Sequence, residues 1–233
     1  MAAAVKRAAG FPPATGMLNL RLGDAKGTVR KVLCLGAHCD DIEIGCGGTI
    51  LRLTRENPDL EFYWIVFSST PQRKREARQA ARLFLKTTAR SRVVIRSFRD
   101  SFFPYEGRVI KEFVESVKRN FQPDLIFTHH RDDLHQDHRL VSELTWNAFR
   151  NHLILEYEIP KYDGDWGAPN FFVSLDETLC QRKIANILRS FHSQAGKPWF
   201  TEDTFRAILR IRGMEAKAES RFAEGFYCRK AVV

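Results

Sequence analysis

Short apolar runs alternate with segments of helical periodicity along most of this chain. Four runs rich in β-branched and aromatic residues predict strands, at 31–38, 61–69, 91–98 and 123–130, the first of them a buried strand. The segments between and after them space their apolar residues three or four positions apart. This spacing predicts helices over 48–58 (ending before Pro58), 71–86, 106–121 and 137–151. The alternation of strands and helices is typical of a mostly parallel sheet with helices on both faces.

We therefore predict an α/β fold of the Rossmann-like, three-layer αβα type. The pattern is looser after residue 151, with apolar runs at 153–160 and 170–175, a Gly/Pro/Asp loop at 163–169, and helices near 176–191 and 201–217. We find no linker, internal repeat or low-complexity segment. The prediction is a flexible leader over 1–28, followed by a single domain over 29–233.

Composition and charge narrow the class of protein. No apolar run reaches the roughly 18–20 residues of a membrane span, and the N-terminal segment has no apolar core of a signal peptide. We therefore expect a cytoplasmic protein. The five cysteines match no zinc or redox spacing, and we expect no disulfide framework in a chain of this size. The net charge of +9 is scattered, with one denser run at 72–82 that we interpret as a solvated helix face.

Two polar clusters follow predicted strands. The stretch GAHCDDIEIGCGG (36–48) comes after the first strand, and THHRDDLHQDHR (128–139) comes after the fourth. Ligands of open parallel sheets bind outside the carboxyl ends of the strands. Both clusters are therefore expected at the same edge of the sheet, where their His and Asp side chains would form a metal site.

The spacing within the clusters suits zinc. His38 and Asp41 are three residues apart, as are His135 and His138, so each pair can point the same way in a turn. Two His and one carboxylate would fill three places and leave one open for water, although the same set also suits ferrous iron. The second Asp of the pair would then be free to take a proton from that water, and the remaining His to stabilise an oxyanion.

The motifs resemble those of a known family. AHCDDIEIGCGG (37–48) is similar to the A-H-P-D-D-x-E-x-G-x-G-G motif of the PIG-L/LmbE-like zinc-dependent N-deacetylases, and HQDH (135–138) is similar to their H-x-D-H motif. Weaker similarities are RKREARQAA (73–81), RDSFFP (99–104), FHSQ (191–194) and AEGF (223–226). The resemblance covers roughly 31–228, nearly everything except the leader.

The resemblance implies roles for individual residues. His38, Asp41 and His138 match the zinc ligands of the family. Asp40 matches the general base, and His135 matches the residue that stabilises the oxyanion and assists the leaving amine.

Further positions match supporting and substrate-contacting residues. The supporting residues are Asp137, expected to orient a His, and Glu43; the substrate-binding ones are Arg73, Asp100 and His192. Cys39 replaces the usual Pro of the first motif, and the Leu-Gly after the Arg/Glu helix is Phe-Leu here. Neither departure touches a proposed ligand or base.

Several residues keep two interpretations. His129 and His130 are further site residues or a packed and an exposed side chain, and Asp132 and Asp133 support the site or are solvated loop acids. A set of C-terminal aromatics could stack on a sugar ring, but core packing or an oligomer contact is favoured: Tyr157, Tyr162, Trp166 and Trp199.

The function expected from these motifs is removal of the N-acetyl group from an N-acetylated amino sugar, similar to N-acetylglucosamine, by zinc-activated water. We expect no nucleic-acid partner and no membrane span, and the oligomeric state stays open. One alternative is another metal-dependent amidase or phosphoesterase on the same scaffold. A more distant one is a basic nucleic-acid-binding protein, which would leave both His/Asp clusters unexplained.

Overall fold

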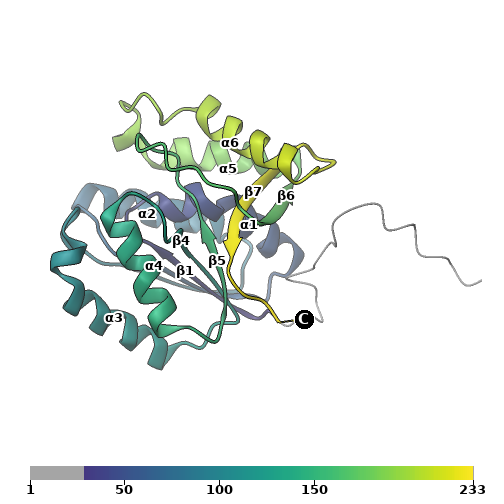
Figure 1. The fold of residues 1–233 in the computed structure, drawn as a ribbon. Coiled ribbons are helices and arrows are strands. Elements are labelled where there is room, and N and C mark those ends of the chain that lie inside the picture. The colour runs from purple at the N-terminus through teal and green to yellow at the C-terminus, as the bar shows by residue number, and fades with distance from the viewer. Residues whose placement is uncertain (1–28, 233) are drawn as a thin grey trace, which may run out of the picture.

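The structure, a computed structural model, describes residues 29–232; the predicted leader lies outside this range. The described residues fold around one seven-stranded sheet in the order β3-β2-β1-β4-β5-β7-β6 (Figure 1). The strands are β1 (Lys31–Gly36), β2 (Glu61–Val66), β3 (Arg90–Ile95), β4 (Leu125–His129), β5 (Leu153–Tyr157), β6 (Phe171–Leu175) and β7 (Phe222–Cys228).

Helices cover both faces of the sheet. They are α1 (Asp41–Glu56), α2 (Pro71–Phe84), α3 (Gly107–Asn120), α4 (Gln136–Ala148), α5 (Glu177–Ser190) and α6 (Glu202–Glu215), with short 3₁₀ turns η1 (Phe103–Tyr105) and η2 (His192–Gln194). No helix in this part of the chain is long and apolar enough to cross a bilayer.

The alternation of side chains along β1 divides the core in two. Val32 and Cys34 face one apolar cluster, which α1, α2, α5 and α6 complete. Leu33 and Leu35 face the other cluster, completed by α3 and α4 (Figure 1). Successive side chains of a strand point to opposite faces, so a buried strand needs apolar residues at every position. The predicted three-layer α/β architecture is confirmed.

The sheet is mostly parallel, as predicted. Strands β1 to β5 pair in parallel, whereas β7 is antiparallel to both β5 and β6. The sequence analysis assigned no strand to β7. Its apolar run is interrupted by Glu224 and Gly225, which the structure buries.

The chain reverses direction across the sheet between β1 and β4. From β1 it proceeds outward to β2 and β3, then returns to place β4 on the other side of β1. The two segments that leave the carboxyl ends of β1 and β4 therefore diverge to opposite faces of the sheet and open a crevice between them. Both polar clusters identified in the sequence lie at this crevice.

Helix α1 begins at Asp41, so the prediction that this helix starts at residue 48 is wrong. Three glycines in the first turns weaken intrinsic helix propensity and hid the start of the helix. These glycines allow α1 to pack closely against its neighbours. A Cβ on Gly45 would lie 2.2 Å from the ring of Tyr157, and one on Gly48 would lie 2.3 Å from Leu175. The missing side chains let α1 approach the strands beneath it.

Candidate metal centre and active site

The polar clusters meet at the crevice between β1 and β4. His38 lies in the turn after β1, and Asp41 is the first residue of α1. His135 is the N-cap residue of α4, and His138 lies in its first turn. The crevice thus joins the N-terminal ends of two helices, one from each face of the sheet. The helix dipoles there favour the negative charge that the Asp side chains carry.

Three side chains converge on one point. The His38 Nδ1 atom lies 3.2 Å from His138 Nε2 and 3.5 Å from Asp41 Oδ2. His138 Nε2 lies 3.7 Å from the same Asp41 oxygen. Ligands about 2.0–2.1 Å from a tetrahedral zinc ion are separated from one another by about 3.4 Å. The three separations bracket this value, so the donor set fits zinc in chemistry and in spacing.

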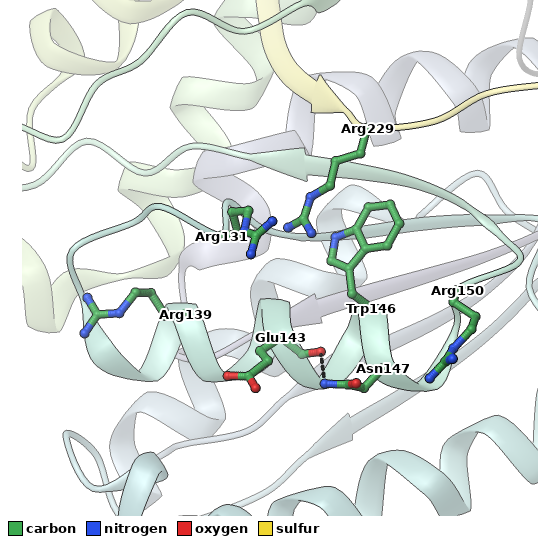
Figure 2. A pocket seen from close by; sticks show the side chains of 7 residues that line it. All are labelled: Arg131, Arg139, Glu143, Trp146, Asn147, Arg150 and Arg229. Carbon is green, nitrogen blue, oxygen red and sulfur yellow. Dashed lines mark hydrogen bonds between the residues drawn. The ribbon is translucent and has the colours of Figure 1, made fainter.

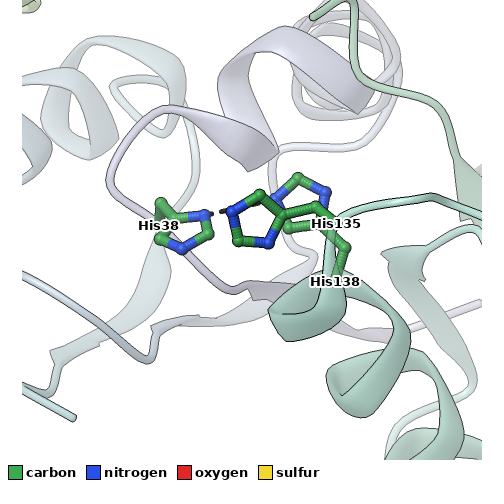
Figure 3. A group of neighbouring side chains, drawn as sticks. All are labelled: His38, His135 and His138. Atoms are coloured by element: carbon green, nitrogen blue, oxygen red, sulfur yellow. Dashed lines mark hydrogen bonds between the residues drawn. The ribbon is translucent and has the colours of Figure 1, made fainter. Parts of the chain in front are cut away.

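His135 stands beside this group (Figure 3). Its ring centroid lies 4.8 Å from that of His38 and 4.6 Å from that of His138. Its Nδ1 accepts a hydrogen bond from the backbone N–H of Asp137, 3.2 Å away. Burial, together with the charge of His38, lowers the pKa of His135 below its ordinary value. The neutral ring therefore carries its proton on Nε2, where it can donate to a substrate atom in the cleft.

Asp133 fixes the orientation of His138. The His138 Nδ1 atom lies 2.9 Å from Asp133 Oδ2, which turns Nε2 toward His38 and Asp41. The other carboxylate oxygen, Oδ1, accepts from the backbone N–H of His135 and pairs with Lys161 at 3.1 Å. Although burial alone raises the pKa of Asp133, its bond with His138 lowers it below the ordinary value. The sequence left Asp133 as a support or a solvated acid; the structure buries it in contact with His138.

Asp137 contacts the opposite side of His38. Its Oδ2 lies 3.3 Å from His38 Nε2, and its two oxygens also accept backbone N–H bonds from Ser101 at 2.7 Å and Phe103 at 3.1 Å. These bonds hold Ser101 at a φ of 65°, a left-handed conformation that is costly for a residue with a side chain. Asp137 thereby fixes both the His38 ring and the loop that carries Asp100.

Asp100 approaches His38 from the solvent side. Its Oδ1 lies 3.2 Å from His38 Nε2, and the bond to His38 lowers the pKa of Asp100 to about 2. The carboxylate is largely exposed and lines the cleft.

Asp40 pairs with Arg73 and is not part of the group formed by His38, Asp41 and His138. Its Oδ1 lies 2.7 Å from the Arg73 guanidinium, which α2 carries near its N-terminal end. Burial raises the pKa of Asp40 despite the charge of Arg73. Both residues line the same cleft as His38 and His138. The neighbouring acids Asp40 and Asp41 thus occupy different positions: one lies among the imidazoles, the other beside them and next to a cation.

The cleft over these residues has a volume of about 320 Å³. Its far wall comes from the loop after β5 and from the segment after η2, and it contains Ile159, Pro160, Lys161, Tyr162, Asp163, Lys197 and Trp199. Tyr162 is 74% exposed there, so its ring is available to a ligand. Of the other aromatics considered from the sequence, Tyr157 is buried and donates its hydroxyl to the Leu35 carbonyl, and Trp166 does not line the cleft.

Two predicted site residues have surroundings that their motifs did not indicate. His192 is exposed and does not line the cleft; the adjacent Ser193 instead binds Glu76 through its backbone N–H and hydroxyl. Glu43 is fully buried, and neither of its oxygens has a hydrogen-bond partner among the described residues. Burial raises the pKa of Glu43 well above its ordinary value, which favours the neutral form of this carboxyl.

His129 is a further residue at the site, for which the sequence left two interpretations. His129 is completely buried at the end of β4, where its Nε2 accepts from the Ala37 backbone at 2.9 Å and lies 3.1 Å from Asp41 Oδ2. Its ring stacks on that of His138, with centroids 3.9 Å apart. The sequence did contain a sign of this role, because His129 is the last residue of a buried strand that ends at a polar cluster.

Comparisons with known proteins agree with this geometry. The family described as PIG-L, GlcNAc-PI de-N-acetylase, matches residues 33–149. The uncharacterized deacetylase YaiS of Escherichia coli is 28% identical over 169 residues, which are 67% of this chain and 88% of that protein. Diacetylchitobiose deacetylase of Thermococcus kodakarensis is 28% identical over 118 residues, 47% of this chain and 44% of that protein.

A solved structure shows the same fold. The N,N'-diacetylchitobiose deacetylase of Pyrococcus horikoshii superposes with a TM-score of 0.65 at 24% identity, covering 86% of this chain and 84% of that one. The matched family segment runs from β1 to the end of α4, and it contains all five of the central side chains of the cleft: His38, Asp40, Asp41, His135 and His138.

Proposed function

Since the chain belongs to the PIG-L family, whose match spans half of it, we propose that it is a metal-dependent N-deacetylase of N-acetylated amino sugars. The observation that carries the proposal is the convergence of His38, Asp41 and His138, with Asp40 and His135 beside them in one cleft. Relatives named as diacetylchitobiose deacetylases support a sugar substrate.

His38, Asp41 and His138 would hold the metal, for which zinc fits best and ferrous iron is the alternative. A bound zinc ion supplies a Lewis acid that makes a water molecule nucleophilic near neutral pH. Asp133 and Asp137 keep the imidazoles of His138 and His38 in place. Supporting carboxylates of this kind typically account for 10- to 100-fold in metal affinity.

Asp40 acts as the base. Its carboxylate lies in the cleft, outside the metal-binding group, and takes a proton from the attacking water as the oxygen adds to the acetamide carbonyl. The Arg73 guanidinium, 2.7 Å away, fixes the direction of that carboxylate. Arg73 is therefore a positioning group for Asp40 as well as a candidate contact for the sugar.

His135 stabilises the oxyanion. Its Nε2–H faces the cleft because its Nδ1 is occupied by the Asp137 backbone N–H. As the tetrahedral intermediate collapses, the C–N bond breaks and the amine nitrogen takes the proton that Asp40 removed from the water. The free amine and acetic acid leave, Asp40 and His135 are back in their starting protonation states, and the acetic acid ionises to acetate in solution.

Tyr162 and Trp199 line the cleft opposite the metal-binding group and offer aromatic faces to a sugar ring.

The cytoplasm is the proposed location, since all five cysteines are free, as a reducing compartment would leave them.

The proposal is tested by acetate release from N,N'-diacetylchitobiose and N-acetylglucosamine, with phosphate release from a phosphomonoester measured in parallel. We expect acetate release that stops after dialysis against a chelator and returns with zinc. Phosphate release without acetate release would instead establish the phosphoesterase alternative.

A further inference from the structure

A second concave surface runs along the outer face of α4 (Figure 2). It has a volume of about 550 Å³. It is lined by Arg131, Arg139, Glu143, Trp146, Asn147, Arg150 and Arg229. We call it the arginine groove; none of its lining residues lines the cleft over the metal-binding group.

Helix geometry explains why one helix supplies most of the groove. Its residues 139, 143, 146 and 147 lie three or four positions from one another or side by side at 146 and 147, so they fall on one stripe of the helix surface, and Arg150 lies just beyond the C-terminal end of the helix. The opposite stripe, with Val141 and Leu144, packs into the core. Arg131 and Arg229 complete the groove from the segments that follow β4 and β7.

The groove carries an excess of positive charge. The lining contains four arginines and one carboxylate, that of Glu143, and none of the ion pairs found among the described residues joins Glu143 to a groove arginine. Arg139 donates to the backbone carbonyls of Asp133 and Leu134. Arg131 has only the exposed Asp132 at 3.9 Å. Burial and the nearby charge of Arg131 lower the pKa of Arg229 below its ordinary value, despite the neighbouring Glu156. Cations crowded in this way favour an anionic ligand.

A buried carboxylate makes the groove rigid. Glu156, with no exposed surface, accepts hydrogen bonds from the Trp146 indole, from the Arg229 guanidinium and from the Arg131 backbone N–H. The Arg229 guanidinium lies 4.3 Å from the centroid of the Trp146 ring. These contacts fix Arg229 and Trp146 before any ligand arrives, which reduces the entropy lost on binding.

We propose that the arginine groove binds a small metabolite with two or more adjacent phosphate groups, such as a nucleoside diphosphate. Guanidinium groups bind phosphate oxygens through pairs of parallel hydrogen bonds, and the side chains of Arg131 and Arg229 lie near each other in the groove, with Arg139 and Arg150 at its two ends (Figure 2). Its volume lies within the range of small-molecule sites, which favours a metabolite over an extended polymer. The inference is independent of the deacetylase proposal, since binding requires neither metal nor turnover.

The test is calorimetric titration of the full chain with ADP, and with adenosine as the ligand that lacks the phosphates. We expect saturable binding of about one ADP per chain and none of adenosine. The double variant Arg131→Gln/Arg150→Gln should weaken ADP binding at least tenfold, because both side chains are exposed and can be changed without unfolding the protein. The control Arg78→Gln removes an exposed arginine of α2 and should leave the affinity within twofold.

A further variant locates the ligand. His138→Ala alters the metal-binding group and should leave ADP affinity unchanged. Loss of ADP binding in this variant, equal binding of adenosine, or an equal effect of Arg78→Gln would overturn the proposal. So would the absence of ADP binding together with tight, steeply salt-dependent binding of heparin or of phosphatidylserine vesicles, which would identify the groove as a polymer or membrane surface.

Discussion

Asp40 and Asp41 are neighbours in the chain, yet their carboxylates have different surroundings. Asp41 has three imidazoles within 3.7 Å of its Oδ2 atom, whereas Asp40 contacts the Arg73 guanidinium. In the proposed mechanism, Asp41 aims its carboxylate at the metal, and Asp40 stands beside the attacking water. Two adjacent acids at the start of one helix meet both requirements because their side chains leave the backbone in different directions.

Replacing Asp40 separates catalysis from metal binding. We expect Asp40→Asn to lower kcat for acetate release by at least 100-fold, since general-base catalysis typically contributes 10²–10⁴-fold. Bound metal should be unchanged. The matched control Asp59→Asn, at an exposed loop position, should keep full activity. An Asp40→Asn enzyme with normal turnover would remove the proposed base.

Asp133 and Asp132 form a second matched pair of adjacent acids. Asp133 is 3% exposed and bonded to His138, whereas Asp132 is exposed. Asp133→Asn should weaken metal affinity by about 10- to 100-fold, because the imidazole loses the carboxylate that orients it. Competition with a chromogenic chelator measures this affinity. Equal effects of Asp132→Asn and Asp133→Asn would contradict the assigned role.

At the scale of the element, α1 begins at Asp41, directly after its N-cap residue Asp40. Its close packing on the sheet requires glycines, which have no side chain. Gly45→Ala would place a Cβ 2.2 Å from the Tyr157 ring, so the helix or the ring must shift. We expect a loss of about 1–3 kcal/mol in the free energy of unfolding, as in other overpacked cores. Urea denaturation measures the change.

Gly196→Ala is the control for this substitution. A Cβ at Gly196 meets nothing within 4 Å, so the free energy of unfolding should stay within about 0.5 kcal/mol of wild type. Similar losses for both alanine variants would mean that glycine flexibility, and not the close approach to Tyr157, explains the effect.

The glycines of α1 also show where prediction from hydrophobic periodicity fails. The sequence indicated strands, helices and their order, because long apolar patterns mark both kinds of element. It misplaced the start of α1 by seven residues, from Asp41 to Gly48, since glycines lower helix propensity and only tertiary packing shows their use. Strand β7 was missed because Glu224 interrupts its apolar pattern, and a partner for that acid cannot be found from local sequence.

At the scale of the molecule, Glu224 joins the C-terminal strand to α1. It accepts hydrogen bonds from the backbone N–H groups of Gly48 and Thr49 and pairs with the buried Lys183 at 2.7 Å. Glu224→Ala would leave the Lys183 charge buried without its partner. We expect a loss of about 3–5 kcal/mol in the free energy of unfolding, measured by urea denaturation.

Glu219 provides the control. It is an exposed acid before the start of β7, so Glu219→Ala removes a carboxylate from the surface and not from the core. Its expected change is within about 0.5 kcal/mol. A small loss for Glu224→Ala would mean that the Lys183 ammonium reaches water or another acceptor when its partner is removed.

The location of the site followed from the sequence for a topological reason. Polar clusters after two strands of a parallel sheet must lie at one edge, and the reversal between β1 and β4 brings them together. Individual side chains were less predictable. The burial of Asp133 against His138, and the exposure of His192 outside the cleft, depend on how loops settle on the sheet, which local pattern does not encode.

The central claim is that His38, Asp41 and His138 together hold a catalytic metal ion. The most direct test is elemental analysis of the protein purified without added metal, for wild type, His138→Ala and the exposed control His192→Ala. We predict about one zinc or iron ion per chain in wild type and in His192→Ala, and loss of the metal in His138→Ala. Wild-type protein that holds no metal even after zinc reconstitution would contradict the account.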